Sequence, residues 1–220
     1  MHSSLRVSYR GREMVIDCGA DWRGRVGQLA PHAIVLTHAH PDHAAGLVDG
    51  APCPVHATPA TWAAIERYPI RERRTVEPRC PFRIQGIELE AFPVVHSIRA
   101  PAVGYRVTAG AVAIFYAPDV LEIEERQAAL DGIRVYVADG AHLRRPIVRR
   151  RGESRIGHAS VQSQLDWCSE SGVPRVIVTH CGSQIVTGDE RKLGPRLRRM
   201  AQERGLAATI AHDGMEMVLR

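Results

Sequence analysis

The chain has 220 residues, of which 45% are hydrophobic and 24% are charged, and these proportions are typical of a globular protein with its own core. No apolar run approaches the roughly 18 residues that a membrane helix needs, and the N-terminus lacks the apolar segment of a secretory signal. We therefore expect one cytoplasmic domain over residues 1–220, with no membrane partner. The five cysteines include no Cys-x-x-Cys pair, which argues against a disulfide framework and a zinc ribbon.

The formal net charge is +5, from 29 lysines and arginines against 24 aspartates and glutamates. Much of the excess lies in residues 144–155, whose basic members are Arg144, Arg145, Arg149, Arg150, Arg151 and Arg155. A block of this kind attracts phosphate groups, although by charge alone it is more typical of a solvated loop.

Turn residues and apolar runs predict the elements of the first half of the chain. Residues 5–9 and 13–17 form a hairpin that turns at 10–12. Residues 33–37 and 53–57 are short apolar runs, as in strands that are buried on both faces. A helix follows over 58–68, with Thr58 as its N-cap.

The second half predicts strands at 87–95, 103–108, 112–116, 133–138, 173–179, 207–211 and 215–219. Helices are expected at 121–130, 160–170 and 189–203, with Pro195 in the first turn of the longer part of the last one. Strands and helices thus occur in two comparable halves, as in a layered α/β protein whose helices cover paired sheets.

One segment after a buried strand carries four side chains that can bind metal: His38, His40, Asp42 and His43. Residues two apart in an extended segment point the same way, so His38 and His40 can bind one ion. Pro41 favours an extended His40 and can begin a helical turn, which carries Asp42 and His43 to the other side. Imidazole and carboxylate ligands together suit zinc, manganese or iron.

Other apolar strands also end in a histidine or an aspartate. These residues are Asp17, His96, Asp119 and His180, and His158 stands just before the helix expected at 160–170. Each one alone is more typical of a satisfied core or loop residue. Together they predict a site assembled from strand ends, where layered α/β proteins place their ligands. His212, between two expected strands, is a further candidate for the lining of the pocket.

The run from His38 to His43 has the pattern His-x-His-x-Asp-His, and with it the chain resembles the metallo-β-lactamase-fold superfamily. Within it, the chain most resembles the phosphodiesterase branch, which includes ribonuclease Z and the cyclic-phosphate phosphodiesterase of bacterial phosphonate breakdown. The likeness rests on the segment 96–106, on Gly-His-Ala-Ser at 157–160, and on the 22 residues that separate His158 from His180. The resemblance implies a four-layer αββα sandwich of the α/β class.

The resemblance also implies a site for two divalent metal ions, zinc or manganese, with iron as a further option. Its ligand sets are His38, His40 and His96 for one ion and Asp42, His43 and His180 for the other, with Asp119 bridging both. Asp17 would hydrogen-bond ligand histidines and orient them.

In such proteins a hydroxide shared by the two ions is the nucleophile, because bound metals lower the pKa of water towards neutrality. The resemblance gives Asp42 a role in positioning or deprotonating that water. It gives His158 a role in stabilising the transition state or protonating the leaving oxygen. The expected reaction is hydrolysis of a small or cyclic phosphodiester, or of a short nucleic-acid end. Dimers are common in such proteins, so a homodimer is a further expectation, although the sequence shows no interface signal.

Residues 144–155 run directly into His158, so we expect them near the mouth of the metal site. There Arg149, Arg150, Arg151 and Arg155 could clamp a substrate phosphate, because guanidinium groups bind phosphate oxygens through paired hydrogen bonds. A plain solvated loop is the other interpretation of this stretch.

The chain departs from the phosphodiesterase branch in three respects, and the first is that it lacks that branch's Gly-rich N-terminal opening. The bridging aspartate of that branch usually lies in Gly-Asp-Thr, whereas Asp119 lies between Pro118 and Val120. There is no long inserted arm of the kind with which ribonuclease Z holds the tRNA elbow, so full tRNA 3′ processing is not expected.

Three other functions compete with a phosphodiesterase. A thioester, lactone or carboxylic-ester hydrolase, like glyoxalase II or the lactonases, would keep the fold but need neither His158 nor the arginines. A diiron protein that reduces oxygen or nitric oxide usually replaces the second histidine of the motif with a carboxylate, and His40 is intact. A binding module with an inactive site is disfavoured because every ligand position is filled. Fold similarity alone does not choose among these chemistries.

Overall fold

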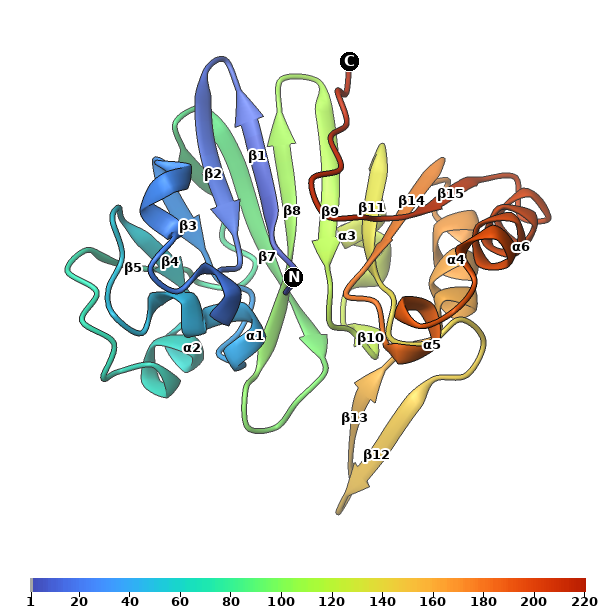
Figure 1. Ribbon diagram of the computed structural model, residues 1–220, viewed down its shortest axis with the longest axis horizontal. Coiled ribbons are helices and arrows are strands. Elements are labelled where there is room, and N and C mark those ends of the chain that lie inside the picture. Colours follow the sequence, from blue (N-terminus) through green and yellow to red (C-terminus); the bar gives the residue numbers. More distant parts are fainter. Residues whose placement is uncertain (1) are drawn as a thin grey trace.

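The computed structural model describes residues 2–220 and contains two β-sheets packed face to face (Figure 1). The first sheet has the order β1 (Leu5–Tyr9), β2 (Arg12–Ile16), β3 (Ala33–Val35), β4 (Val55–Ala57) and β5 (Arg73–Thr75). The second has the order β10 (Glu122–Ile123), β7 (Ile87–Val95), β8 (Ala102–Ala109), β9 (Val112–Ala117), β11 (Val135–Asp139), β14 (Arg175–Thr179) and β15 (Ala207–Ile210), and β6 (Phe82–Ile84) pairs with β7. Strands β2 to β5 are parallel, and so are β9, β11, β14 and β15, so the carboxyl ends of each set meet at one edge.

Helices cover the outer side of each sheet (Figure 1). Those beside the first sheet are α1 (Pro41–Ala44), α2 (Pro59–Ala64) and the 3-10 turns at Ala20–Trp22, Val26–Leu29 and Ala45–Leu47. Those beside the second sheet are α3 (Arg126–Leu130), α4 (Val161–Glu170), α5 (Ser183–Val186) and α6 (Glu190–Gln202). Within residues 2–220, none of these helices is long and apolar enough to cross a membrane.

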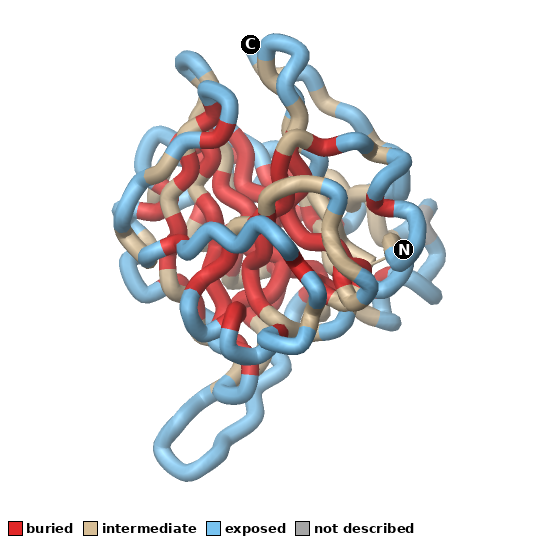
Figure 2. Tube along the Cα trace, turned by 90° about the vertical axis from the view of Figure 1, so that its left-hand side faces the viewer, coloured by how far each residue is buried: buried red, intermediate tan, exposed pale blue. Residues whose placement is uncertain are grey.

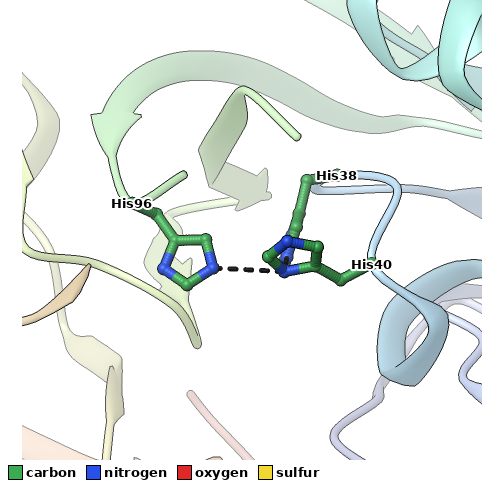
Figure 3. A group of neighbouring side chains, drawn as sticks. All are labelled: His38, His40 and His96. Carbon is green, nitrogen blue, oxygen red and sulfur yellow. Dashed lines mark hydrogen bonds between the residues drawn. The ribbon is translucent and has the colours of Figure 1, made fainter. Parts of the chain in front are cut away.

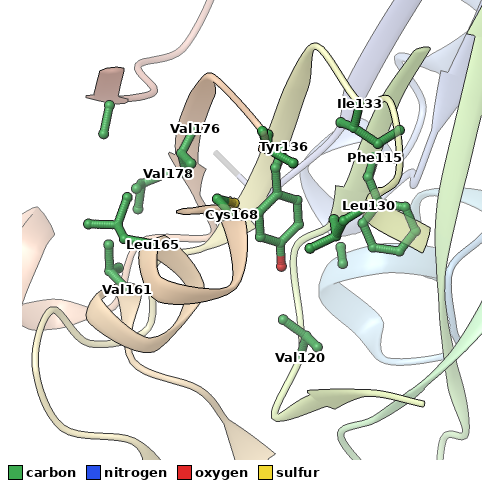
Figure 4. Close-up of a cluster of buried hydrophobic side chains, with 14 of the residues drawn as sticks. Phe115, Val120, Leu130, Ile133, Tyr136, Val161, Leu165, Cys168, Val176 and Val178 are labelled. Carbon is green, nitrogen blue, oxygen red and sulfur yellow. The ribbon is translucent and has the colours of Figure 1, made fainter. Parts of the chain in front are cut away.

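Three clusters of buried side chains fill the spaces between four layers. Ala33 and Val35 join the cluster between the two sheets, whereas Ile34 and Leu36 join the cluster on the outer side of the first sheet. This alternation follows from the two-residue period of a strand. A third cluster lies between the second sheet and its helices, and Figure 4 shows part of it. The predicted αββα sandwich is confirmed.

Most predicted elements are present, and some of their ends differ. The helix expected at 58–68 is α2, and its N-cap Thr58 accepts a hydrogen bond from the Thr61 backbone N–H, but the helix already ends at Ala64. The helix expected at 121–130 begins only at Arg126. Residues 122–123 instead pair with β7 as the short strand β10.

Two predictions for the C-terminal part are wrong. Pro195 lies inside α6 and not in its first turn, because the Asp189 carboxylate caps the helix earlier by accepting from the Arg191 backbone N–H. Residues 215–219 form no strand. Met217 and Leu219 pack against the core between the sheets as an extended tail with no strand partner among the described residues.

The arginine-rich stretch forms a regular hairpin that projects from the body of the protein (Figures 1 and 2). Its strands β12 (Ile147–Arg151) and β13 (Ser154–His158) are antiparallel, and every residue of β12 is exposed. The stretch is therefore solvated, as in the loop interpretation, but it is not irregular.

Candidate metal centre

The side chains predicted to bind metal come together where strands of both sheets end. The segment after β3 supplies His38 and His40, and His96 follows β7 directly. Figure 3 shows that the three rings turn their nitrogens towards one another. One nitrogen of each ring lies within 4.8 Å of the others, so the three form one possible ligand group.

The spacing within this first group fits a single metal ion. His38 Nε2 is 2.9 Å from His40 Nδ1, and His40 Nδ1 is 3.3 Å from His96 Nε2. Nitrogens at tetrahedral positions around zinc, with bonds of about 2.0–2.1 Å, are about 3.3 Å apart. The three histidines therefore lie at distances that one ion can bridge.

A second group of possible ligands lies beside the first: Asp42, His43, Asp119 and His180. His43 Nε2 is 2.6 Å from Asp119 Oδ2, and His180 Nε2 is 3.2 Å from Asp42 Oδ2. Helix α1 begins at Pro41 and carries Asp42 and His43 in its single turn, as the sequence predicts. His180 follows β14 in the left-handed region, with φ 47°, and so turns back to the site.

Three atoms of this second group are buried without a partner in hydrogen-bond geometry among the described residues: His43 Nε2, Asp119 Oδ1 and His180 Nδ1. An unsatisfied buried polar atom costs about 1–3 kcal/mol. Three such atoms that face one another are explained by a cation to which all of them are ligands. The donor set and its orphaned atoms therefore fit a metal ion.

Asp119 lies between the two groups. Its Oδ2 is 3.5 Å from His38 Nε2, and its Oδ1 is 3.3 Å from His180 Nδ1 and 4.0 Å from His96 Nε2. Only 3% of its side chain is exposed. One carboxylate thus faces ligand atoms of both groups, which is the position that a bridging ligand needs.

The pKa shifts of His38 and Asp119 suit metal binding. Burial lowers the pKa of His38 well below its ordinary value, so its imidazole is neutral. Burial by itself would raise the pKa of Asp119, but the close His43 imidazole and the neighbouring histidines lower it, so the carboxylate is ionised. Neutral imidazoles and ionised carboxylates are the forms that bind metal ions. Burial disfavours the charged ring of His43, but the carboxylates of Asp17 and Asp119 raise its pKa well above the ordinary value, so a bound ion would displace its proton.

Asp17 forms a hydrogen bond with the ligand histidine His43, as the resemblance implies. Its Oδ2 accepts a hydrogen bond from His43 Nδ1 at 2.8 Å, and its Oδ1 accepts from the Thr37 backbone N–H at 2.8 Å. The residue is fully buried and has φ 66°, an uncommon conformation for a residue other than glycine. The carboxylate fixes which nitrogen of His43 is free to face the second group.

Replacing Asp17 with asparagine is expected to weaken metal affinity by about 10–100-fold, the usual cost of losing a group that orients a ligand histidine. Asparagine tolerates the left-handed conformation and has the same shape, so the fold should persist. Chelator competition measures the affinity, and Asp49→Asn, at an exposed ion pair with Arg23, is the control. Equal affinity in Asp17→Asn and wild type would show that the hydrogen bond to His43 has no such role.

His158 lies at the edge of the cluster, and the sequence analysis missed its partner, Asp139. His158 Nδ1 is 2.7 Å from Asp139 Oδ2 and 3.3 Å from Asp119 Oδ1. Burial disfavours the charged ring, but the carboxylate of Asp139 raises the pKa of His158 above its ordinary value. Backbone N–H groups of Val120 and Ala141 hold the Asp139 carboxylate in place. Asp139 ends an apolar strand, the same signal that identified the other site residues.

The remaining candidates lie apart from the metal ligands. His158 pairs with Ile147 at the base of the β12–β13 hairpin, so Arg149, Arg150, Arg151 and Arg155 lie further along it. Their role as a phosphate clamp stays a prediction. His212 is exposed and belongs to none of the possible ligand groups within residues 2–220.

Known proteins match both the sequence and the fold. The family model for the beta-lactamase superfamily domain matches residues 12–181. Ribonuclease Z of Mycobacterium marinum (strain ATCC BAA-535 / M) is 24% identical, with 85% of this chain and 82% of that protein covered.

Two solved structures show the same fold. Zn(2+)-bound PqqB from Methylobacterium extorquens has a TM-score of 0.76 at 21% identity, over 99% of this chain and 87% of that one. A diphosphatase from the PhnP family has a TM-score of 0.74 at 20% identity, over 100% of this chain and 85% of that one. Because the family model covers most of the chain, the protein belongs to the beta-lactamase superfamily and is a metal-dependent hydrolase with the metallo-β-lactamase fold.

Proposed function

We propose that the protein is a phosphodiesterase that uses two divalent metal ions. The observation that carries the proposal is the contact of His158 with Asp139 beside the two ligand groups. Hydrolysis of a phosphodiester expels an alkoxide, and a histidine held beside the reacting centre can protonate it. The likeness to ribonuclease Z and to a diphosphatase of the PhnP family supports this class of reaction. Both a small or cyclic phosphodiester and a nucleic-acid end fall within it.

The two ligand groups support a site for two ions. One ion would be held by His38, His40 and His96, the other by Asp42, His43 and His180, and Asp119 would contact both. Divalent ions at these positions supply Lewis-acid charge and lower the pKa of water. Nitrogen and oxygen ligands together suit zinc and manganese, with iron as a further option, and the PqqB structure contains zinc.

The chain's own groups then position and protonate the substrate. Since His158 Nδ1 faces Asp139, the other ring nitrogen, Nε2, is free to meet a leaving oxygen. Asp139 fixes this tautomer by accepting the Nδ1 proton. The Asp42 carboxylate is only half-buried, and His180 and His43 lower its pKa, so it is ionised and can orient water at the second group.

The proposal is tested with metal-reconstituted protein on bis(p-nitrophenyl) phosphate, with p-nitrophenyl acetate in parallel. We expect cleavage of the diester, loss of this activity on chelation, and recovery with Zn²⁺ or Mn²⁺. Little hydrolysis of the acyl ester is expected. Metal-dependent hydrolysis of the acyl ester without diester cleavage would contradict the proposal and favour a carboxylic-ester, thioester or lactone hydrolase.

A further inference from the structure

The β12–β13 hairpin is an arm that begins at the candidate active site. His158, its last residue, contacts Asp139 and Asp119, while the turn at 152–153 lies at the far end of the ladder. Figures 1 and 2 show the hairpin projecting from the body of the protein, and its residues are exposed except for the partly buried residues 156–158 at the base. An exposed two-stranded ribbon buries little apolar surface, so packing alone does not explain its presence.

Two arginines of the hairpin are placed unfavourably unless an anion joins them. Arg150 is directly opposite Arg155 in the antiparallel ladder, so their side chains share one face. Like charges in this arrangement repel each other and destabilise the pair of strands. Neither guanidinium forms an ion pair or a side-chain hydrogen bond with another described residue. The only acidic residue of the hairpin is Glu153, in the turn.

The distance along the hairpin separates this arginine pair from the metal groups. Arg150 and Arg155 lie three ladder positions from Ile147 and His158, which is about 10 Å at the rise of a β-strand. That is further than a single phosphodiester group extends. The odd spacing also turns the pair to the opposite face of the ribbon from His158. The pair is therefore placed to bind a different phosphate from the one held beside His158, and a substrate that reaches both must be a chain of phosphates that passes round the edge of the ribbon.

The composition of the hairpin favours nucleic acid over a membrane as the polyanion. Its exposed apolar residues, Ile147 and Val148, lie at the base, whereas Gly152 and Glu153 form the tip, where a membrane-inserting loop would be apolar. The hairpin has no aromatic side chain to stack on bases. Contacts to a strand would thus be made with its phosphate backbone and would be independent of base sequence.

We propose that the β12–β13 hairpin binds the phosphate backbone of a nucleic-acid strand through Arg150 and Arg155 while the end of that strand lies at the metal centre. This inference rests on the proposed phosphodiesterase function and names its substrate class as an RNA or DNA strand end. Paired guanidinium groups bind phosphate oxygens in a bidentate manner, which also removes the repulsion between the two arginines.

The test measures the affinity of metal-loaded protein for labelled single-stranded RNA and DNA 12-mers and for a dinucleotide by fluorescence anisotropy. R150Q/R155Q should weaken 12-mer binding by about 10-fold or more. It should also lower the slope of log affinity against log salt by about 1.4, since each single-strand phosphate contact contributes about 0.7. Any loss of affinity for the dinucleotide should be much smaller. Comparing RNA with DNA shows which strand is preferred.

The matched control is R196Q/R199Q, which removes two exposed arginines from α6. An equal loss of 12-mer affinity in this control, or no loss of affinity in R150Q/R155Q, would overturn the proposal. R150K/R155K keeps the charge and should retain most of the affinity, and the thermal midpoint of R150Q/R155Q should not fall, because repulsion is removed. Binding to phosphatidylserine vesicles in place of the 12-mers would overturn it in favour of a membrane. Anisotropy needs no turnover, so a failure of the phosphodiesterase proposal is seen separately in the diester assay.

Discussion

Replacing Asp119 with asparagine is expected to lower diester hydrolysis by roughly 10³-fold or more, because loss of metal-ion catalysis costs several kcal/mol of transition-state stabilisation. Both carboxylate oxygens face possible ligands, Oδ2 towards His43 and His38 and Oδ1 towards His180. An amide is a neutral and weaker ligand, so both ions lose affinity together. A two-metal site is expected to hold about two ions per chain in the wild type. Elemental analysis, carried out alongside kcat/KM, should show fewer bound ions per chain in the variant.

The control for this change is Asp131→Asn, at an exposed aspartate at the end of α3. Its metal content and kcat/KM should equal those of wild type. Circular dichroism separates loss of metal from loss of fold. Retention of both ions and of full activity in Asp119→Asn would contradict a bridging role for this carboxylate.

Replacing His158 with alanine is expected to lower hydrolysis by about 10²–10⁴-fold when the leaving group is an alkoxide, the usual contribution of general acid catalysis. The loss should be much smaller with a p-nitrophenolate leaving group, which departs without a proton. The physical reason is that His158 turns Nδ1 to Asp139 and keeps Nε2 for the leaving oxygen. The measurement compares kcat/KM for a nucleoside alkyl phosphodiester with that for bis(p-nitrophenyl) phosphate.

Asp139→Asn should show the same dependence on the leaving group with a smaller loss, about 10–100-fold, because Asp139 acts through His158 as a positioning residue. His212→Ala, at an exposed histidine outside the possible ligand groups, is the control and should match wild type. If His158→Ala lost activity equally on both substrates and also lost metal, then His158 would be a ligand and not an acid.

Much of the candidate site could be predicted because its residues repeat one local pattern. Asp17, His96, Asp119 and His180 each follow or end an apolar strand, and the structure brings all four to one cluster. The fold could be predicted for a related reason. A strand that is buried on both faces has a continuous run of apolar residues, which the sequence shows directly. Alternate residues of β3 are indeed buried in two different core clusters.

The features that escaped prediction did so for different reasons. The strands of the β12–β13 hairpin are rich in arginine and have no apolar alternation, so nothing in the sequence separates them from a loop. Asp139 does end an apolar strand, but no motif joins it to its partner His158, which is 19 residues further along the chain. Proline usually marks the start of a helix, but the earlier cap at Asp189 overrides this tendency at Pro195.

The His38, His40 and His96 group and the Asp42, His43, Asp119 and His180 group each draw residues from both sheets, so an ion bound to either would also close a large ring of chain. His40 and His96 are 56 residues apart, and Asp42 and His180 are 138 residues apart. Because loop-closure entropy grows only with the logarithm of length, the larger ring adds about 0.8 kcal/mol over the smaller one. Two bound ions would therefore act as crosslinks of similar strength between the halves of the sandwich. The side chains that would carry the chemistry would also resist the separation of the sheets.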